Sequence, residues 1–193
     1  MPGKIKSTIE LALEKAARLP KLTKEERRSQ QEREYRPRGR ALAERFLAGD
    51  LAEGDLDLER SGDQGKHREI VREALLASLC QAIDLEDAAA TARAFEGIRV
   101  LARDDDVEQA SRRVNGILRD YQEERERELA RAEEAETAAL RALGVSGSAI
   151  RLNMERSERW RERRSELQER YRPRVDEVKR ELGDHLRRIL SLG

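Results

Sequence analysis

Few side chains in this chain are of a type and spacing that could do chemistry. Residues 104–106 are three consecutive aspartates, and carboxylate oxygens are the ligands that hard divalent cations prefer. His185 follows Asp184 and lies one helical turn after Glu181, a spacing that a metal ion can bridge. A carboxylate-bridged di-metal bundle would repeat a Glu-x-x-His pair on two helices, and this chain has no such pair. We therefore interpret the aspartates as a helix N-cap cluster and His185 as a surface or helix-dipole residue, and predict no metal site.

The single cysteine and the missing catalytic motifs argue against an enzyme. Cys80 lies in an apolar run over residues 74–80, which favours a small buried hydrophobe over a nucleophile. The sequence contains no G-x-x-x-x-G-K-[ST] or G-x-G-x-x-G phosphate loop, and no Ser/His/Asp set with a local signature. We expect no enzymatic activity, no cofactor and no small-molecule substrate, and we nominate no catalytic residue.

The arginines offer a different chemistry. Residues 151–174 hold nine arginines against five glutamates, with Trp160 and Tyr171 among them. A basic helix that carries aromatic side chains can bind RNA through phosphate contacts and base stacking. The residues that would make these contacts are Arg156, Arg161, Arg163 and Arg164. The alternative is i,i+4 ion pairing on solvated faces, which the interleaved carboxylates favour.

Composition limits the fold to an all-α class. Of the 193 residues 41% are charged and 3% aromatic, and 40 basic residues balance 40 acidic ones. Opposite charges interleaved at helical spacing favour helices laced with ion pairs, and the β-branched and aromatic runs of an all-β fold are missing. No apolar stretch approaches the roughly 20 residues that a membrane span needs, and no signal peptide is evident at the N-terminus. We expect a cytoplasmic protein.

Apolar spacing and breaker residues predict three parts before the C-terminal half. They are N-terminal helices over residues 1–49 that break or kink at Pro37, an acidic linker over residues 50–65 with one short helical turn around Leu56, and a compact helical pair over residues 66–103. The second helix of the pair is expected to start at Asp84. Proline is the reason for the predicted kink, because it removes a backbone donor and clashes with the preceding turn.

Residues 104–193 predict a long antiparallel helical hairpin of coiled-coil type, with its turn at residues 144–147. Apolar residues follow 3-and-4 spacing on both arms, the second of which includes Ile150 and Met154. Folding about the turn pairs positions whose numbers add to about 292 or 293. This register places Val114 opposite Val178, Tyr121 opposite Tyr171 and Trp160 opposite Ala132. Pro173 is expected to kink the second arm near Tyr171.

The first 51 residues carry a family resemblance. Residues 5–15, 23–26 and 46–51 resemble, in order and spacing, the start of a group of uncharacterised, mostly helical bacterial proteins. The resemblance implies a bacterial cytoplasmic helical protein of unknown function, and it carries no catalytic residue across. A Tyr-Arg-Pro-Arg string occurs at residues 35–38 and again at 171–174, which we interpret as coincidence in a chain this rich in arginine.

These observations favour a non-enzymatic interaction or scaffold protein that binds another protein or a second copy of itself. Two alternatives stay open. The first is an RNA- or ribosome-associated factor that uses the arginine-rich face of residues 151–174. The second is a stalk-like or chaperone-like hairpin within a larger assembly.

Overall fold

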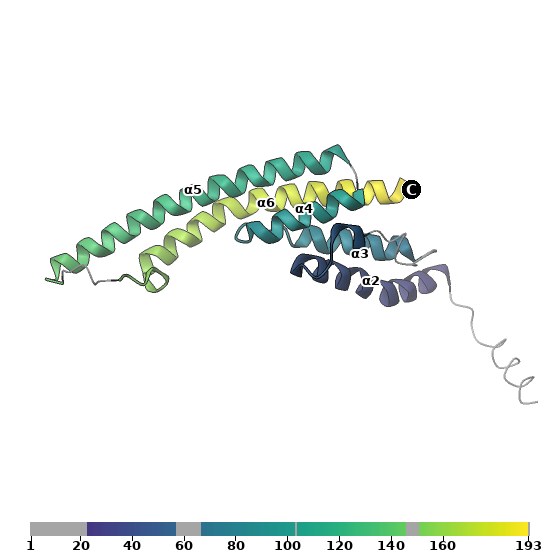
Figure 1. The fold of residues 1–193 in the computed structure, drawn as a ribbon, viewed down its shortest axis with the longest axis horizontal. Coiled ribbons are helices and arrows are strands. Elements are labelled where there is room, and N and C mark those ends of the chain that lie inside the picture. The colour runs from purple at the N-terminus through teal and green to yellow at the C-terminus, as the bar shows by residue number, and fades with distance from the viewer. Residues whose placement is uncertain (1–22, 57–66, 103, 146–150, 193) are drawn as a thin grey trace, which may run out of the picture.

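The protein is all-α, as the sequence predicts. The computed structural model describes residues 23–56, 67–102, 104–145 and 151–192, and within these ranges the regular elements are helices without a strand (Figure 1). They are α2 (Lys24–Ala48), α3 (Arg68–Gln81), α4 (Ala88–Ala102), α5 (Asp105–Ala142) and α6 (Glu158–Leu192), with short 3-10 helices η1 (Glu53–Leu56) and η2 (Met154–Arg156). None of the described helices is long and apolar enough to cross a bilayer. The predicted N-terminal helix, the linker after residue 56 and the second half of the predicted turn lie outside the described residues.

The first described helix, α2, packs along α3 in the same direction. Its N-terminus is a capping box, in which the Thr23 hydroxyl accepts from the Glu26 amide and the Glu26 carboxylate accepts from the Thr23 amide. The Tyr35 ring stacks on His67, with ring centroids 4.0 Å apart, at the start of α3. Further along both helices, Gly39 lies so close to α3 that a Cβ there would sit 2.4 Å from the Val71 carbonyl oxygen.

Of the predicted break or kink at Pro37, the break is wrong, because α2 continues through this residue to Ala48, and the kink stays a prediction. Pro37 withholds one backbone hydrogen bond, but the residues that follow it are held by tertiary packing on α3. Gly39, Ala43 and Phe46 are the buried residues of α2, and they lie on one face at helical spacing. The helix ends at Gly49, whose left-handed φ of 91° closes it.

One apolar core joins the N-terminal helices to the C-terminal pair. Its buried side chains come from α2, η1, α3, α4, α5 and α6. Leu56 in η1 has no exposed surface, so the described part of the predicted acidic linker contributes to this core. η1 also agrees with the predicted helical turn around Leu56. The predicted boundary at residues 50–65 therefore does not interrupt the apolar core.

The second helix of the compact part starts at Ala88, four residues later than predicted. Asp84 is tied instead to Thr91, whose hydroxyl accepts from the Asp84 amide at 2.8 Å and donates to the Asp84 carbonyl at 3.0 Å. The Asp87 carboxylate accepts from the Ala90 amide, which is the hydrogen bond of a helix N-cap. These side-chain bonds offer the backbone an alternative to helix before residue 88.

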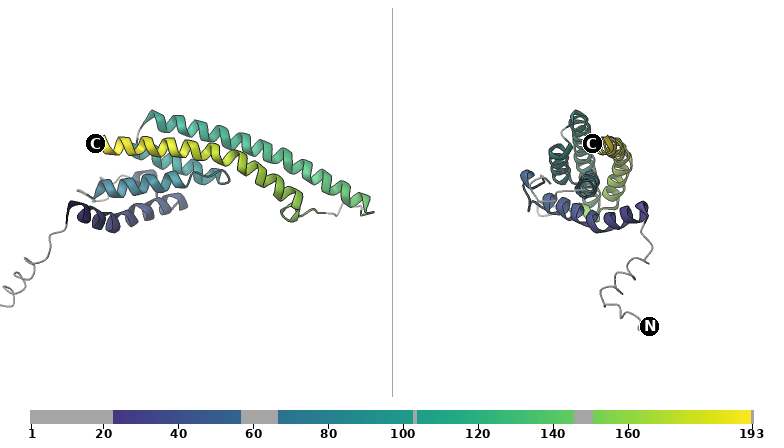
Figure 2. Two further views of the ribbon diagram at one scale, coloured as in Figure 1. Left: turned by 180° about the vertical axis from the view of Figure 1, so that it is seen from behind. Right: turned by 90° about the vertical axis from the view of Figure 1, so that its right-hand side faces the viewer.

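Helices α5 and α6 lie side by side in opposite directions (Figures 1 and 2). The Tyr121 and Tyr171 rings meet edge to face at 5.6 Å, and ion pairs also cross the seam between the helices. Among them are the pairs of Arg113 with Glu181 and of Arg163 with Glu128. With 38 residues, α5 is about 57 Å long at 1.5 Å per residue. Pro173 lies within α6, which continues through it.

The second arm begins later than the apolar spacing suggested. Met154 belongs to η2, and α6 starts at Glu158. Ser157 acts as its N-cap, because its hydroxyl oxygen accepts from the Trp160 amide at 3.2 Å. The same hydroxyl donates to Glu136 of α5 at 2.8 Å, which fixes the start of α6 against the facing helix.

Burial is concentrated at one end of the pair. Between Val107 and Tyr121, α5 buries seven side chains, whereas beyond Tyr121 it buries Ala132 alone. In α6, Trp160 is the one buried residue before Leu167. We call residues 122–142 and 158–166 the distal hairpin. It consists of two polar helix segments whose buried residues are Ala132 and Trp160 and between which ion pairs form, whereas the basal part belongs to the core.

The close contact at Gly39 makes a prediction about stability. Replacing a helix-interior glycine with alanine ordinarily stabilises a protein by up to about 1 kcal/mol. Gly116→Ala should do so, because a Cβ there meets nothing within 4 Å. Gly39→Ala should instead destabilise by about 1–3 kcal/mol, since the new methyl group would push α2 off the α3 backbone. Urea unfolding followed by circular dichroism measures both, and equal stabilisation by the two substitutions would show that the α2/α3 contact is not this close.

Candidate functional site

The structure brings together two features that the sequence presented separately. The aspartates at the start of α5 lie beside His185 near the end of α6. The His185 Nε2 atom is 3.2 Å from a carboxylate oxygen of Asp104, and its Nδ1 atom is 3.2 Å from one of Asp106. The predicted register pairs Val107 with Leu186, because their numbers add to 293. It therefore already places the aspartates before Val107 next to His185, and the cluster could have been predicted from it.

The cluster favours a structural clamp over a metal centre. One ligand atom from each of Asp104, Asp106 and His185 lies within 4.8 Å of the others, so the set has the donors for a divalent cation. However, the two ring nitrogens face different carboxylates, so the imidazole bridges two residues at the start of α5 and does not direct one nitrogen at a shared ligand position. Asp104 is also the N-cap of α5, where it accepts from the Asp106 amide at 2.8 Å. That backbone hydrogen bond, together with the hydrogen bond to His185, lowers the pKa of Asp104 below its usual value.

The two carboxylates that the sequence offered as partners of His185 lie elsewhere. Glu181 pairs with Arg113 of α5, and Asp184 pairs with Arg187 on its own helix. The carboxylates nearest the His185 ring thus lie across the seam, not along α6.

Substitution of Asp104 separates its two roles. Asp104→Ala removes the cap and the charge and should destabilise by about 1–2 kcal/mol, whereas Asp104→Asn keeps the cap and loses the charge. The lowered pKa means that the charge stabilises the fold above the ordinary pKa of 3.8, and that this stabilisation is lost as the pH falls through the folded value. Urea midpoints at pH 7 and at acid pH should therefore differ more for the wild type than for Asp104→Asn. A metal centre would instead show as a midpoint that Zn²⁺ raises in the wild type and not in His185→Gln.

A second polar cluster joins the core to the hairpin at Glu86, in the loop before α4. The hydroxyl of Tyr121, a residue of α5, donates a hydrogen bond of 2.9 Å to the Glu86 carboxylate. The guanidinium of Arg164, a residue of α6, donates one of 2.8 Å to the same carboxylate. Burial alone would raise the pKa of Glu86, but hydrogen bonds from Arg164, Gln168 and Tyr121 outweigh it and lower the pKa to about 2. One carboxylate thus holds both arms against the compact part.

Glu86→Gln tests this junction. The substitution keeps the shape and removes the charge, and it should lower stability at pH 7 by about 1–2 kcal/mol. Because the folded pKa is depressed, the contribution of Glu86 is present above about pH 4.5 and disappears as the pH falls toward 2. Glu96→Gln, at an exposed position of α4, is the matched control and should change little. Equal urea midpoints for the two variants would show that Glu86 does not stabilise the attachment of α5 and α6 to the compact part.

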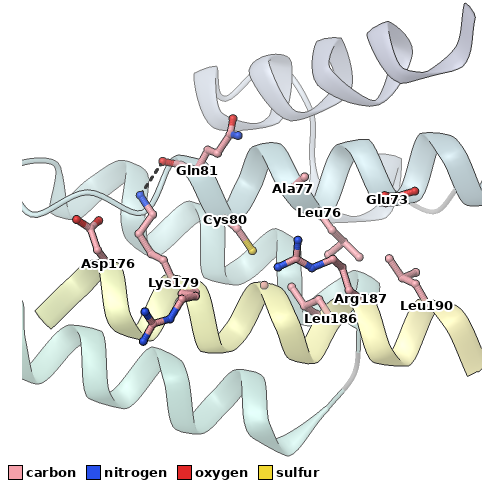
Figure 3. Close-up of a pocket in the computed structure, with 12 residues that line it drawn as sticks. Glu73, Leu76, Ala77, Cys80, Gln81, Asp176, Lys179, Leu186, Arg187 and Leu190 are labelled. Carbon is pink, nitrogen blue, oxygen red and sulfur yellow. Dashed lines mark hydrogen bonds between the residues drawn. The ribbon is translucent and has the colours of Figure 1, made fainter. Parts of the chain in front are cut away.

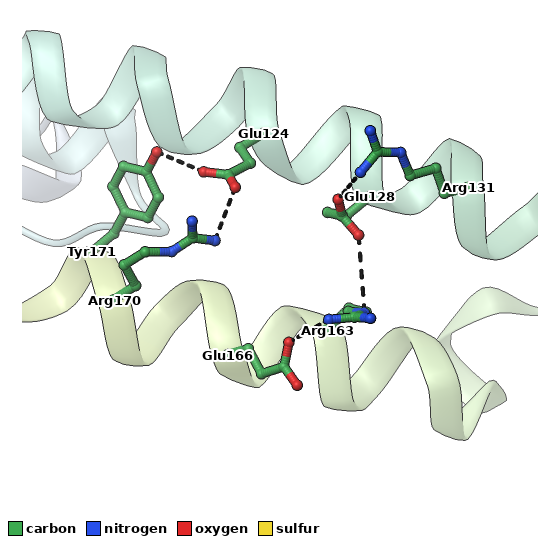
Figure 4. Close-up of polar contacts among 7 residues, drawn as sticks. All are labelled: Glu124, Glu128, Arg131, Arg163, Glu166, Arg170 and Tyr171. Carbon is green, nitrogen blue, oxygen red and sulfur yellow. Dashed lines mark hydrogen bonds and ion pairs between the residues drawn. The ribbon is translucent and has the colours of Figure 1, made fainter.

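The arginine-rich face is interlaced with carboxylates (Figure 4). Glu124 of α5 accepts from the Tyr171 hydroxyl at 2.8 Å and lies 2.9 Å from the Arg170 guanidinium. These hydrogen bonds lower the pKa of Glu124. Glu128, further along α5, lies 4.0 Å from Arg163. Such pairs are exposed and each contributes little to stability, but together they cover much of the polar seam.

The four predicted nucleic-acid contacts divide into two pairs. Arg163 is ion-paired with Glu166 as well as Glu128, and Arg164 is ion-paired with Glu86 and Glu155. Arg156 and Arg161 are exposed and form no ion pair with a described residue. Base stacking by the aromatics of this face is ruled out by burial, because Trp160 is 1% and Tyr171 7% exposed.

A groove runs between α3 and α6, around Cys80 (Figure 3). Its volume is about 430 Å³, and we call it the α3/α6 groove. It is lined by Glu73, Leu76, Ala77, Cys80, Gln81, Asp176, Lys179, Arg180, Gly183, Leu186, Arg187 and Leu190. Burial raises the pKa of the Cys80 thiol to about 11, against the smaller opposing effect of Lys179 and Arg187. Cys80 is therefore a neutral thiol at pH 7, which matches the buried hydrophobe predicted from the sequence and not a nucleophile.

Together these features define an all-helical protein in which a compact cluster continues into an antiparallel pair of long helices. The chain belongs to a family of unknown function, DUF6657, whose model matches residues 57–184, which is 128 of the 193 residues. The match begins after η1 and ends near the C-terminus of α6, so it covers α3 to α5 and leaves out the N-terminal residues 5–51 that carry the sequence resemblance. No curated protein and no solved structure matches the chain.

Proposed function

We propose that this is a non-catalytic helical interaction protein, in which Leu143 and Val145, directly after α5 at the end of the distal hairpin, contact a protein partner. We call these two residues the tip. The observation that carries the proposal is the exposure of two large apolar side chains where α5 ends. Leu143 is 79% exposed and Val145 45% exposed, and they are the exposed large hydrophobic residues of the part of the chain that the structure describes. Exposed apolar side chains close together in the chain favour a contact that would remove them from water.

The length of the distal hairpin supports contact with a partner at a distance from the core. From Tyr121 to Ala142, α5 extends by roughly 30 Å at 1.5 Å per residue. Beyond Tyr121, the one buried residue of α5 over this length is Ala132. A two-helix arm with little apolar surface of its own holds the tip away from the core and leaves it accessible.

Two alternatives keep narrower support. An RNA- or ribosome-associated role would rest on Arg156 and Arg161, since the other two arginines of that face are ion-paired. It predicts salt-dependent RNA binding that weakens when Arg161, Arg163 and Arg164 are changed to Glu. A stalk in a larger assembly would use the same tip, and co-purification from the native cell separates it from a binary complex. A bacterial source and a cytoplasmic location remain predictions from the sequence.

Site-specific photo-crosslinking in the native cell tests the tip. A photoreactive residue placed at Leu143 should yield a discrete crosslinked species, because the apolar tip contacts the partner. The same residue at Ala130, an exposed position on the side of α5, is the matched control and should yield far less. Val145→Glu should abolish the Leu143 crosslink and leave the urea midpoint unchanged, since an exposed side chain contributes little to folding.

The pattern of crosslinks decides the proposal. A partner captured at Leu143 and lost with Val145→Glu supports it, and a product of twice the chain mass would identify the partner as a second copy. Equal capture at Leu143 and Ala130, or capture that survives Val145→Glu, would contradict a role for the tip.

A further inference from the structure

We propose that the α3/α6 groove is a docking site for an amphipathic helix of another protein, one that carries acidic side chains beside its apolar stripe. This deepens the proposed function by naming the chemistry of a partner. The groove is formed by α3 and α6 where they pack against each other in the core, and not by the residues after α5. The two proposals can therefore be tested independently.

The floor of the groove is apolar and has an open centre. Leu76 and Cys80 of α3 face Leu186 of α6 across it, and Leu190 continues the apolar surface toward the end of α6 (Figure 3). Gly183 lines the groove between these residues, and a Cβ built on it meets nothing within 4 Å. A helix-interior glycine is unfavourable by about 1 kcal/mol relative to alanine. Its lack of a side chain leaves room for an incoming one.

The dimensions fit a short helix. Along α6 the lining residues extend from Asp176 to Leu190, which is roughly 21 Å at 1.5 Å per residue, or about four turns. Along α3 they extend from Glu73 to Gln81, about 12 Å. A groove of this length accepts apolar side chains at i, i+3 or i+4, and i+7 of a docked helix.

The charge around the groove selects the partner. A smaller groove between α2 and α3 shares Glu73, Ala77 and Gln81 with it and adds Arg36 and Arg40. Among the residues that line the two grooves, five are basic and two are acidic: Arg36, Arg40, Lys179, Arg180 and Arg187 against Glu73 and Asp176.

Part of this positive charge is cancelled locally, because Arg36 also pairs with Glu32 and Arg187 pairs with Asp184. Arg40, Lys179 and Arg180 form no ion pair with a described residue, so their charge remains. Glu73 is already paired with Arg36 at 3.6 Å. Lys179 donates to the carbonyls of Gln81 and Ile83, which bind its ammonium without removing its charge. The surface therefore complements glutamates and aspartates that flank an apolar stripe.

The same charges disfavour two other occupants. Residues 1–22 of this chain contain five basic and two acidic residues, so their net charge has the same sign as the groove. A second copy that docked α6 antiparallel on α6 around Gly183 would bring Arg180 of one copy toward Arg187 of the other. Like charges at such a contact oppose association.

Two synthetic peptides provide the test. Both are 18-residue helices with leucine at i, i+4, i+7, i+11 and i+14, and they differ only in having glutamate or lysine at the flanking positions. Fluorescence anisotropy of each labelled peptide with the full chain should show that the glutamate peptide binds at least about tenfold more tightly, a difference of roughly 1.4 kcal/mol. A higher salt concentration should reduce the difference in affinity between the two peptides, because part of the preference is electrostatic.

Paired variants locate the binding. Gly183→Leu fills the groove and should weaken the glutamate peptide by about tenfold or more. Gly116→Leu is the matched control, because its Cβ also meets open space but lies outside the groove, and it should leave binding within about twofold. The double variant Arg180→Glu/Arg187→Glu should reverse the preference toward the lysine peptide. Circular dichroism of each variant checks that it is folded.

Four outcomes would overturn the inference. They are no binding of either peptide, equal binding of both, glutamate-peptide binding that Gly183→Leu leaves unchanged, and occupancy by another segment. The last would appear as dimerisation lost in Gly183→Leu, which identifies a second copy. It would also appear as glutamate-peptide affinity that rises about tenfold when residues 1–22 are deleted, which identifies the N-terminal segment.

Discussion

The structure depends on one apolar stripe along α6 that must be buried from two sides. Its residues recur every three or four positions, and all are less than a tenth exposed: Leu167, Tyr171, Val175, Val178, Leu182 and Leu186. Helix α5 covers one side of the stripe, and α3 packs against α6 as well. Because side chains at this spacing share one helical face, a slip of α5 by one residue would expose them. The burial of this stripe thus fixes the register of the helix pair and attaches it to the compact part.

The stripe also explains why the two ends of the helix pair differ. Before Leu167 the spacing continues with one large residue, Trp160, and the seam passes from aliphatic contact to ion pairs. Exposed ion pairs contribute from nearly zero to about 1 kcal/mol each, whereas burying a large apolar side chain contributes about 1.5–3 kcal/mol. The distal hairpin is therefore the less stable part, and segments of low local stability are where binding and conformational change concentrate.

The sequence was sufficient to predict the features that side-chain periodicity determines, which are the helices of the C-terminal half and their pairing. The 3-and-4 spacing pairs Tyr121 with Tyr171, and their rings are in contact. Prediction from the sequence failed where tertiary contacts override a local rule. Helix α2, which packs on α3, continues through the expected break at Pro37, and the Asp84–Thr91 hydrogen bonds precede the later start of α4. The His185 cluster follows from the predicted pairing of α5 with α6, although the sequence analysis did not draw it. The α3/α6 groove depends on the packing of α3 against α6, which no periodicity predicts, and Gly183 alone indicated only an unfavourable helix-interior residue.

The most direct test of the account is a distance across the distal seam. Cysteines at Glu128 and Arg163, in a chain whose single native Cys80 is replaced by alanine, lie on facing helices in the observed register. A bis-maleimide linker of about 10 Å should join them within one molecule in dilute solution. A cysteine at Arg174 in place of Arg163 is displaced by eleven residues, or roughly 16 Å, and should not react with the one at Glu128. Efficient crosslinking of the 128/174 pair, or products formed only between molecules for 128/163, would contradict the antiparallel pairing of α5 and α6 in this register.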